Sequence, residues 1–390
     1  MKRSGLSAVV ASALVVVGGL SFTSPPLSDV IQWGESKEYL VNSELHIEAY
    51  QDRYEAAKQY EMNLKDTPLV FPVVVEGGSS ELDAARLNPR LYLDDHLAKA
   101  DFKLINAGSS SDSQLARFAI EEFKGKQIDV RLDEYLTCYD MKVDEKRAQR
   151  IGWPDSWDDS NVQSALEPQM YIESTNESIA KVASEVVGKE PKKIPPYVMA
   201  KLIARETVMR MQVSGTSISK DRYGKIDGLN VQGAERALAR RRGTLFDAAC
   251  AFVALSRASG LPARPVIVLD NEDNGEMIAW VEFYLPTAGW VSIDLRELIA
   301  GPGMMKQLNR PWKGFGTNDE LDQLVPIAHH FHPPFGVLAG GLKGKPMLWG
   351  WIPVPEHTPN NQRLRFVLQD APKRASTSRK KMSTKRGSGK

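Results

Sequence analysis

The sequence contains few of the residues that most often act as nucleophiles, bases or metal ligands. Among its 390 residues there are only two cysteines, Cys138 and Cys250, and six histidines. Two cysteines exclude the dense disulfide framework that stabilises many small secreted domains. Because unpaired cysteine is usually buried and behaves as a small hydrophobic residue, we expect two free, buried thiols. A bridge between Cys138 and Cys250 is the alternative.

An excess of charge of one sign is lacking as well, since 50 Lys and Arg face 49 Asp and Glu. The balance conceals a basic C-terminus, because residues 373–390 contain eight Lys or Arg and no acid. Without those eight, 42 basic residues face 49 acidic ones, a formal charge of −7 for the body of the chain. We expect residues 371–390 to be a disordered basic tail that is solvated or attracted to anionic lipid or a cell-wall polymer.

The first 24 residues have the pattern of an export signal. Lys2 and Arg3 precede an uncharged, apolar run over residues 5–22. This pattern predicts a signal peptide or an uncleaved signal anchor over residues 1–24. The protein is therefore predicted to be exported, and to be periplasmic, secreted or anchored on the outer side of a membrane. Nucleic acid is not expected as a partner, and membrane association through this segment or the basic tail stays open.

Residues 28–150 are predicted to form a β-rich domain. Short apolar runs and alternation of period two recur at residues 69–75, 101–106, 115–120 and 128–143. Alternation of this kind is typical of half-buried strands, so the segment is predicted to be β-sandwich-like. One helix is expected over residues 44–65, where charged and aromatic residues recur at helical spacing.

Residues 172–370 are predicted to form a second domain of mixed helix and strand. A capping-box pattern at residues 174–177 predicts a helix start, and further helices are expected over residues 195–211 and 231–242. The segment 245–259 is apolar on several faces and is expected to be a buried central helix. Strands expected at residues 265–269, 277–285 and 290–295 would form an antiparallel sheet beneath it. The fold class is therefore α+β.

The stretch from Arg241 to Glu297 carries a set of regularly spaced motif residues. They are Gly243, Asp247, Ala249, Phe252, Leu255, Arg257, Gly260, Pro262, Ala263, Arg264, then Ala279, Trp280, Val281, Glu282, and finally Gly289, Trp290, Val291 and Asp294. This pattern resembles the core of the transglutaminase-like superfamily, over about residues 172–300. The resemblance implies a papain-like fold with Cys-His-Asp catalytic logic.

Two of the three catalytic positions that this resemblance implies hold apolar residues. The family's cysteine, histidine and aspartate fall at Leu245, Ile278 and Asp294. Leu245 cannot ionise and Ile278 cannot accept a proton, so neither a thiol nucleophile nor its base is present. We expect no catalytic residue at these positions, because losing one member of such a set already removes most of the rate. Asp294 is expected to close a turn or bind a backbone amide.

Other candidate residues have both a functional and a structural interpretation. Cys250 lies more than one helical turn beyond Leu245, so it is expected to face the core instead of a cleft. The histidines of the HHFH segment, His329, His330 and His332, are expected to be loop or packing residues, and no metal or cofactor is predicted. Trp280 and Trp290 are candidate aromatic contacts for a peptide or glycan, with core packing as the alternative.

The sequence therefore predicts an exported, catalytically inactive transglutaminase-like protein, a pseudoenzyme. It would act as a scaffold or binding module for a protein, peptide or glycan of the cell envelope. The alternative is an active acyl transferase or cysteine peptidase that uses non-standard residues, with Cys250 or the three histidines as candidates.

Overall fold

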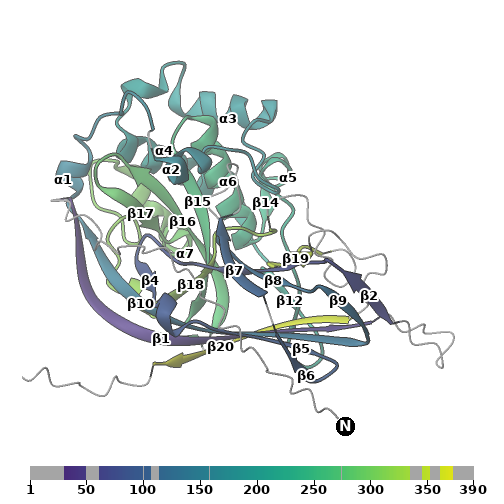
Figure 1. The fold of residues 1–390 in the computed structure, drawn as a ribbon. Helices are drawn as coiled ribbons and strands as arrows, with labels where there is room; N and C mark the ends of the chain where they lie inside the picture. The colour runs from purple at the N-terminus through teal and green to yellow at the C-terminus, as the bar shows by residue number, and fades with distance from the viewer. Residues whose placement is uncertain are drawn as a thin grey trace, which may run out of the picture.

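The computed structural model describes residues 30–49, 61–99, 101–106, 114–157, 159–273, 275–333, 345–351 and 361–371. Strands dominate up to Val143, and helices are gathered in the part of the chain that follows (Figure 1). The predicted export signal at residues 1–24 lies outside the described residues, as does the predicted tail apart from Ala371.

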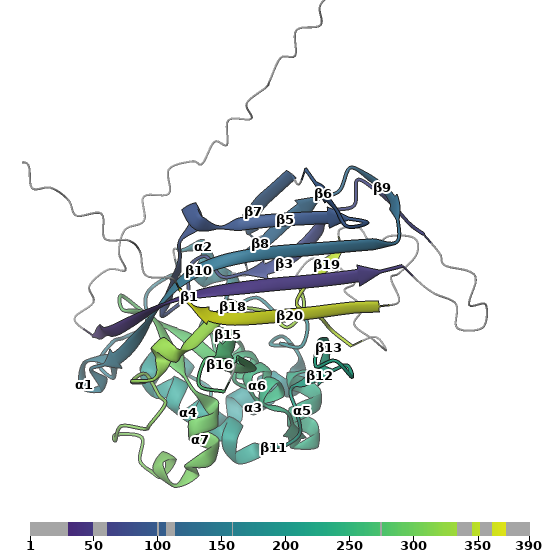
Figure 2. The same cartoon turned by 90° about the horizontal axis from the view of Figure 1, so that it is seen from below.

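The largest sheet has eight strands and is centred on three long antiparallel ones. β1 (Ile31–Glu48) pairs on one side with β10 (Gln127–Val143) and on the other with β20 (Asn361–Asp370). Figure 2 shows these three strands side by side. The order is β12-β13-β20-β1-β10-β5-β6, with β4 also paired to β10. The shorter members are β4 (Ser80–Leu82), β5 (Asn88–Leu93), β6 (His96–Ala98), β12 (Ile218–Lys220) and β13 (Ile226–Leu229).

Alternate residues of the central strands are buried, because one face of the sheet covers the core. Val41 and Leu45 in β1 are buried in this way, as are Val130 and Leu132 in β10. The strand predicted over residues 128–143 is thus confirmed. The helix predicted over residues 44–65 is wrong at both ends, since Glu44–Glu48 lies in β1 and Met62–Lys65 forms β2. Hydrogen bonding to strands on both sides overrides the local helical spacing.

A second, four-stranded sheet packs against the first and makes this part sandwich-like. Its order is β19-β3-β8-β7, and a small pair, β2 with β9 (Glu122–Gly125), extends beside it. The rings of Phe71 in β3 and Phe366 in β20 lie 6.3 Å apart, so side chains of the two sheets meet between them. The strands are β3 (Leu69–Val73), β7 (Asp101–Asn106), β8 (Gln114–Ala119) and β19 (Gly350–Trp351). The predicted β-sandwich-like layer is confirmed.

The second half of the chain packs a buried helix on an antiparallel sheet. The sheet has the order β17-β16-β15-β18, with β15 (Ala263–Asp270), β16 (Glu276–Leu285), β17 (Gly289–Ile293) and β18 (Leu324–Ala328). Helix α6 (Leu245–Ala258) packs on β15 and β16. It is surrounded by α3 (Glu177–Val187), α4 (Pro196–Arg210), α5 (Ala234–Arg240) and α7 (Leu295–Ala300). This arrangement confirms the α+β fold class and the central helix.

Shorter elements complete the described chain. They are the helices α1 (Glu145–Ala148) and α2 (Ser160–Ser164), the parallel pair β11 (Gln212–Val213) and β14 (Arg242–Gly243), and the 3₁₀ turns η1 (Ala84–Arg86), η2 (Pro191–Lys193), η3 (Pro302–Lys306) and η4 (Leu321–Gln323). β11 and β14 join the end of α4 to the residues just before α6.

The two parts of the chain interlock through their strands. β20, β19 and the β12–β13 hairpin belong to the predicted 172–370 unit, yet they complete sheets of the predicted 28–150 unit. The parts also meet face to face, because any side chain at Gly78 would collide with the carboxylate of Glu282 in β16. Figure 2 shows the resulting order of layers, from the long strands through β15 and β16 to the helices.

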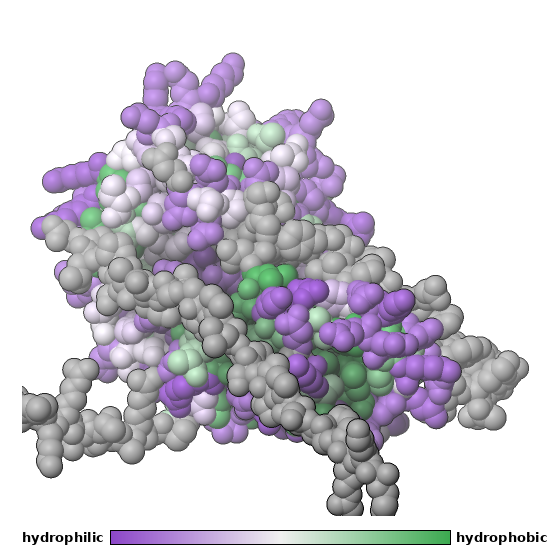
Figure 3. Space-filling model, viewed as in Figure 1, coloured by the Kyte–Doolittle hydropathy of each residue, from purple (hydrophilic) through white to green (hydrophobic). Residues whose placement is uncertain are grey.

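The surface differs between the two ends of the molecule. On the face drawn in Figure 3, the helical end is mainly hydrophilic, and hydrophobic residues gather lower, around the strands of the first half. Leu97 of β6 and Leu104 of β7 are exposed by 67% and 38%. None of the helices in the described parts of the chain is both long and apolar enough to cross a membrane.

Replacing Leu364 by alanine tests whether β20 is an integral part of the large sheet. Leu364 is fully buried, so we expect the free energy of unfolding to fall by about 3 kcal/mol. The matched control is Arg365→Ala, whose side chain is 56% exposed and should cost less than about 1 kcal/mol. Urea unfolding of both variants measures the difference. Equal, small effects would mean that β20 is not packed in this way.

Candidate functional site

The start of helix α6 is held by a capping box. Thr244 is the N-cap, and its backbone N–H donates to Asp247 Oδ2 over 2.8 Å, while Asp247 N–H donates to Thr244 Oγ1 over 3.3 Å. The Asp247 carboxylate also accepts from the backbone N–H groups of Gln232 and Gly233, at 2.7 and 3.2 Å. Thr244 Oγ1 thus satisfies an N–H of the first turn, and the buried Asp247 carboxylate satisfies the backbone N–H groups of the residues that lead into the helix. Asp247 is thus a structural residue.

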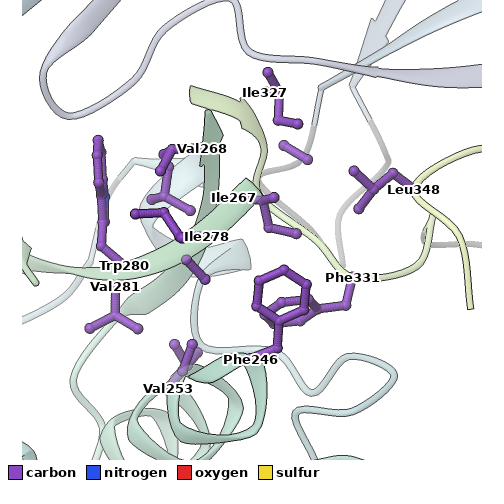
Figure 4. Close-up of a cluster of buried hydrophobic side chains, with 14 of the residues drawn as sticks. Phe246, Val253, Ile267, Val268, Ile278, Trp280, Val281, Ile327, Phe331 and Leu348 are labelled. Atoms are coloured by element: carbon purple, nitrogen blue, oxygen red, sulfur yellow. The ribbon is translucent and has the colours of Figure 1, made fainter. Parts of the chain in front are cut away.

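Leu245 and Ile278 occupy the elements that the sequence predicted for them, but their surroundings are apolar. Leu245 opens α6 and is partly buried against the core, and Ile278 lies in β16 with 8% of its surface exposed. Figure 4 shows Ile278 beside Val268, its cross-strand partner, within a cluster of buried hydrophobic side chains. The residue after Leu245, Phe246, packs its ring 5.1 Å from that of Phe331.

Asp294, the third triad position, has the structural role that was expected of it. It is the N-cap of α7 and accepts from the backbone N–H of Arg296 over 2.8 Å. The Arg296 guanidinium also bridges it to Asp270, with N–O distances of 3.1 and 2.8 Å. Asp294 lines a cleft of about 810 Å³ whose lining includes neither Leu245 nor Ile278. Of the three triad positions, this cleft therefore contains Asp294 alone.

Neither cysteine is placed to act as a nucleophile. Both thiols are free and fully buried, as predicted, Cys138 in β10 and Cys250 in α6. Burial raises the pKa of the Cys250 thiol well above its usual value, and the nearby charge of Asp247 adds to the effect. Burial raises the pKa of Cys138 in the same way. A thiol that stays protonated and shielded from solvent is inert.

The remaining polar residues of the motif form buried structural contacts. Arg264 Nε lies 2.8 Å from Glu282 Oε2, so a cross-strand ion pair joins β15 and β16. Ser292 of β17 donates to the other oxygen of Glu282 at 3.3 Å. Arg257 Nε donates to the carbonyl oxygen of Ala263 at 2.8 Å and ties the end of α6 to β15. These contacts explain the spacing of the motif without any catalytic step.

The two candidate tryptophans differ in their accessibility. Trp280 is 1% exposed and is part of the core. Trp290 is half-buried, with its ring 5.4 Å from that of Tyr284 and the Arg264 guanidinium carbon 4.0 Å from the Trp290 ring centre. Of the two, only Trp290 retains surface that a ligand could contact.

The three histidines of the HHFH segment are core residues. His329, His330 and His332 follow β18 and are 2%, 3% and 7% exposed. His330 Nε2 donates to the carbonyl oxygen of Leu348 at 3.0 Å, so the neutral ring carries its proton on Nε2. Burial lowers the pKa of His330 to about 4, and burial together with the charge of Arg264 lowers the pKa of His329. Within the described ranges, no group of three or more His, Cys, Asp or Glu side chains is arranged to hold a metal ion.

A second cleft of about 810 Å³ lies at the start of α6 and was not anticipated from the sequence. Gly243, Thr244 and Asp247 contribute to its lining, together with four cationic side chains: Arg236, Arg240, Arg242 and Lys345. The cluster Arg240–Arg242 in the sequence was a signal for part of it. Lys345 could not be added without the fold, because it is about a hundred residues away in the chain.

Comparison with known proteins accounts for this framework. Residues 181–295 match the family model of the transglutaminase-like superfamily. The chain contains a transglutaminase-like domain. The matched residues run from α3 to the first residue of α7 and so include all three triad positions. No protein of curated function matches this transglutaminase-like chain.

One solved structure extends the similarity beyond the matched residues. The chain is similar to the crystal structure of "a Putative Cysteine Protease" from Cytophaga hutchinsonii, with 15% identity, a TM-score of 0.52, and coverage of 88% of this chain and 94% of that one. At this identity the likeness concerns the fold, which thus has a counterpart over most of the chain. The periplasmic domain of TgpA from Pseudomonas aeruginosa matches with 15% identity, a TM-score of 0.31, and coverage of 70% and 91%.

Breaking the buried Arg264–Glu282 pair on one side tests its structural role. Glu282→Leu leaves the Arg264 guanidinium buried without its carboxylate, and we expect the free energy of unfolding to fall by about 3–5 kcal/mol. The double variant Arg264→Met, Glu282→Leu removes both charges and should be less destabilised than Glu282→Leu. An exposed pair, Lys193–Glu190, provides the control, and Glu190→Gln should cost less than about 1 kcal/mol. If the double variant had a lower free energy of unfolding than Glu282→Leu alone, the result would contradict this interpretation.

The buried histidines predict that the protein loses stability in mild acid. The pKa of His330 in the folded protein, about 4, lies below the unfolded value of 6.5, so between these pH values the unfolded chain binds more protons. The stabilisation is therefore complete above pH 6.5 and is lost as the pH falls toward 4, by about 3 kcal/mol for His330. His330→Gln should flatten the slope of unfolding free energy against pH in urea titrations. The exposed His96→Gln variant should keep the slope, and equal slopes in both variants would refute the prediction.

Proposed function

We propose that this chain is an exported, catalytically inactive transglutaminase-like protein that serves as a scaffold or binding module in the cell envelope. The observation that carries the proposal is the pair of apolar residues at the nucleophile and base positions. Leu245 and Ile278 lie in the right elements, yet they pack into the hydrophobic core. A cysteine protease mechanism needs an ionisable thiol and a proton acceptor at these two places.

The remaining polar groups near the site do not supply a substitute triad. Cys250 and the three histidines, the candidates for catalysis by non-standard residues, are buried. Burial raises the pKa of the Cys250 thiol and lowers the pKa of the His329 and His330 imidazoles, which favours their uncharged forms. The Asp294 carboxylate already accepts from the backbone N–H of Arg296 at the start of α7 and pairs with the Arg296 guanidinium. The motif residues instead cap the start of α6, cap the start of α7 and join β15 to β16 and β17. We therefore favour a retained framework over an active acyl transferase or peptidase.

The proposed location and partners rest on the two ends of the sequence. Lys2, Arg3 and the apolar run over residues 5–22 support export, and an uncleaved run would anchor the protein to a membrane. The basic residues of 373–390 would add attraction to an anionic envelope surface. A protein, peptide or glycan of the envelope is the proposed partner.

Labelling with a thiol-reactive peptide probe tests the proposed inactivity. We expect Cys250 in the native protein to react at least about a hundredfold more slowly than in urea, because its thiol is buried and protonated. Mass spectrometry of the labelled peptides gives the rate for each cysteine, with Cys138 as the internal control. Fast native labelling of Cys250 that a peptide substrate blocks would instead identify an active enzyme.

A complementary variant restores the missing chemistry. Leu245→Cys with Ile278→His places a thiol at the start of α6, where the helix dipole lowers its pKa, and a base in β16. We expect alkylation at neutral pH to be at least about tenfold faster for this thiol than for Leu245→Cys alone. Equal rates would mean that the histidine at position 278 does not lie close enough to accept a proton from the thiol at position 245.

A further inference from the structure

The cleft at the start of α6 is lined by cations that the protein itself leaves without a counter-ion. Arg236 and Arg240 belong to α5, Arg242 to β14, and Lys345 to the segment 345–351, where it lies beside Gly228 of β13. In the part of the chain that the structure describes, none of the four forms an ion pair with a carboxylate. Arg236, Arg240 and Arg242 are also exposed, so these guanidinium groups can reach an external anion.

The hydrogen bonds that these side chains donate go to neutral acceptors of the cleft lining. Lys345 Nζ donates to Asn230 Oδ1 at 2.9 Å, and Arg240 Nη1 donates to Gln232 Oε1 at 3.3 Å. Arg242 Nε donates to Ser214 Oγ at 3.4 Å. Each of these contacts uses one donor and leaves others on the same cation for a ligand.

The one acid in the lining does not neutralise the cleft for a ligand. Asp247 is 2% exposed, and its oxygens are already taken by the backbone and side chain of Thr244 and by the backbone N–H groups of Gln232 and Gly233. Four cations and one internally compensated carboxylate leave a formal charge of about +3. The start of α6, whose dipole is positive at this end, faces the same side.

We propose that this cleft binds an acidic peptide segment, with its carboxylates held by Arg240, Arg242, Arg236 and Lys345. The proposal rests on the proposed function as a binding module and names the class of its ligand. Arg236 and Arg240 are one helical turn apart, about 6 Å along α5, and Lys345 joins the lining from a distant part of the chain, beside Asn230. Cations spread in this way suit a chain that presents several carboxylates better than one compact anion. The planar guanidinium groups can each grip a carboxylate with two parallel hydrogen bonds.

The test measures binding of a fluorescein-labelled oligoglutamate peptide to the full chain by fluorescence anisotropy. We expect saturable binding at about 50 mM NaCl that weakens at about 300 mM, since the contacts are between charges. An oligoglutamine peptide of the same length should not bind. Arg240→Gln with Arg242→Gln should weaken binding at least about tenfold, because each substitution removes a charge-assisted hydrogen bond to the peptide.

Two matched controls separate the cleft from other basic surfaces of the same chain. Lys99→Gln with Lys126→Gln removes two exposed cations from the strand-rich half and should leave the affinity unchanged. Lys380→Gln, Lys381→Gln and Lys385→Gln together reduce the charge of the basic C-terminus. This variant should retain saturable binding, with a change in affinity smaller than that of the arginine variant.

The outcomes decide between this proposal and its competitors. Binding that the C-terminal variant abolishes and the arginine variant leaves intact would overturn the cleft as the site. Displacement of a bound dye by pyrophosphate, with no binding of the oligoglutamate peptide, would show a small phosphate ligand and also overturn it. Failure of the proposed inactivity is seen separately, as native labelling of Cys250, because that readout does not involve the cleft.

Discussion

Helix α6 is buried almost all round, and this constraint shapes the half of the chain that surrounds it. Twelve of its fourteen residues are buried, and its start is fixed by Thr244 and Asp247, whose side chains each accept the backbone N–H of the other. The Asp247 carboxylate also holds the backbone of Gln232 and Gly233. One buried acid therefore fixes the helix start, the loop before it and the approach of α5.

The same constraint explains how the framework can be held with hydrophobic residues at two of the triad positions. Thr244 and Asp247 cap α6, Arg264 and Glu282 join two strands, and Asp294 caps α7. Each contact stabilises the fold whether or not a thiol stands at position 245. The two positions with a purely chemical role, 245 and 278, are the ones occupied by hydrophobic residues. Leucine and isoleucine at these two positions thus leave the framework contacts intact, and their burial adds to its stability.

The interlocking of the two halves has a further consequence for the site. The sheet that carries Ile278 and Glu282 has helices on one face and the strand-rich layer on the other, with Gly78 directly against Glu282. The last strand, β20, returns to the middle of the first sheet. The position equivalent to a catalytic base therefore lies deep between layers, whereas the start of α6 stays near the surface beside the cationic cleft.

The sequence by itself determined the local elements of the transglutaminase-like part and the identity of its motif. The helices near residues 177, 196 and 245 and the strands β15 to β17 were predictable, because apolar periodicity and helix-start residues are local signals. The capping box predicted at residues 174–177 was wrong in detail, since Asn176 is the N-cap of α3 and accepts from the backbone N–H of Ser178. The burial of Cys250 was predictable from its place on an apolar helix for the same reason. The helix predicted over residues 44–65 was wrong, because the pairing of β1 with two distant strands outweighs local spacing. Only the tertiary structure placed β20 beside β1, Gly78 against Glu282 and Lys345 in the same cleft as Arg240. These contacts join residues far apart in the chain, and a local sequence pattern does not determine which distant residues meet.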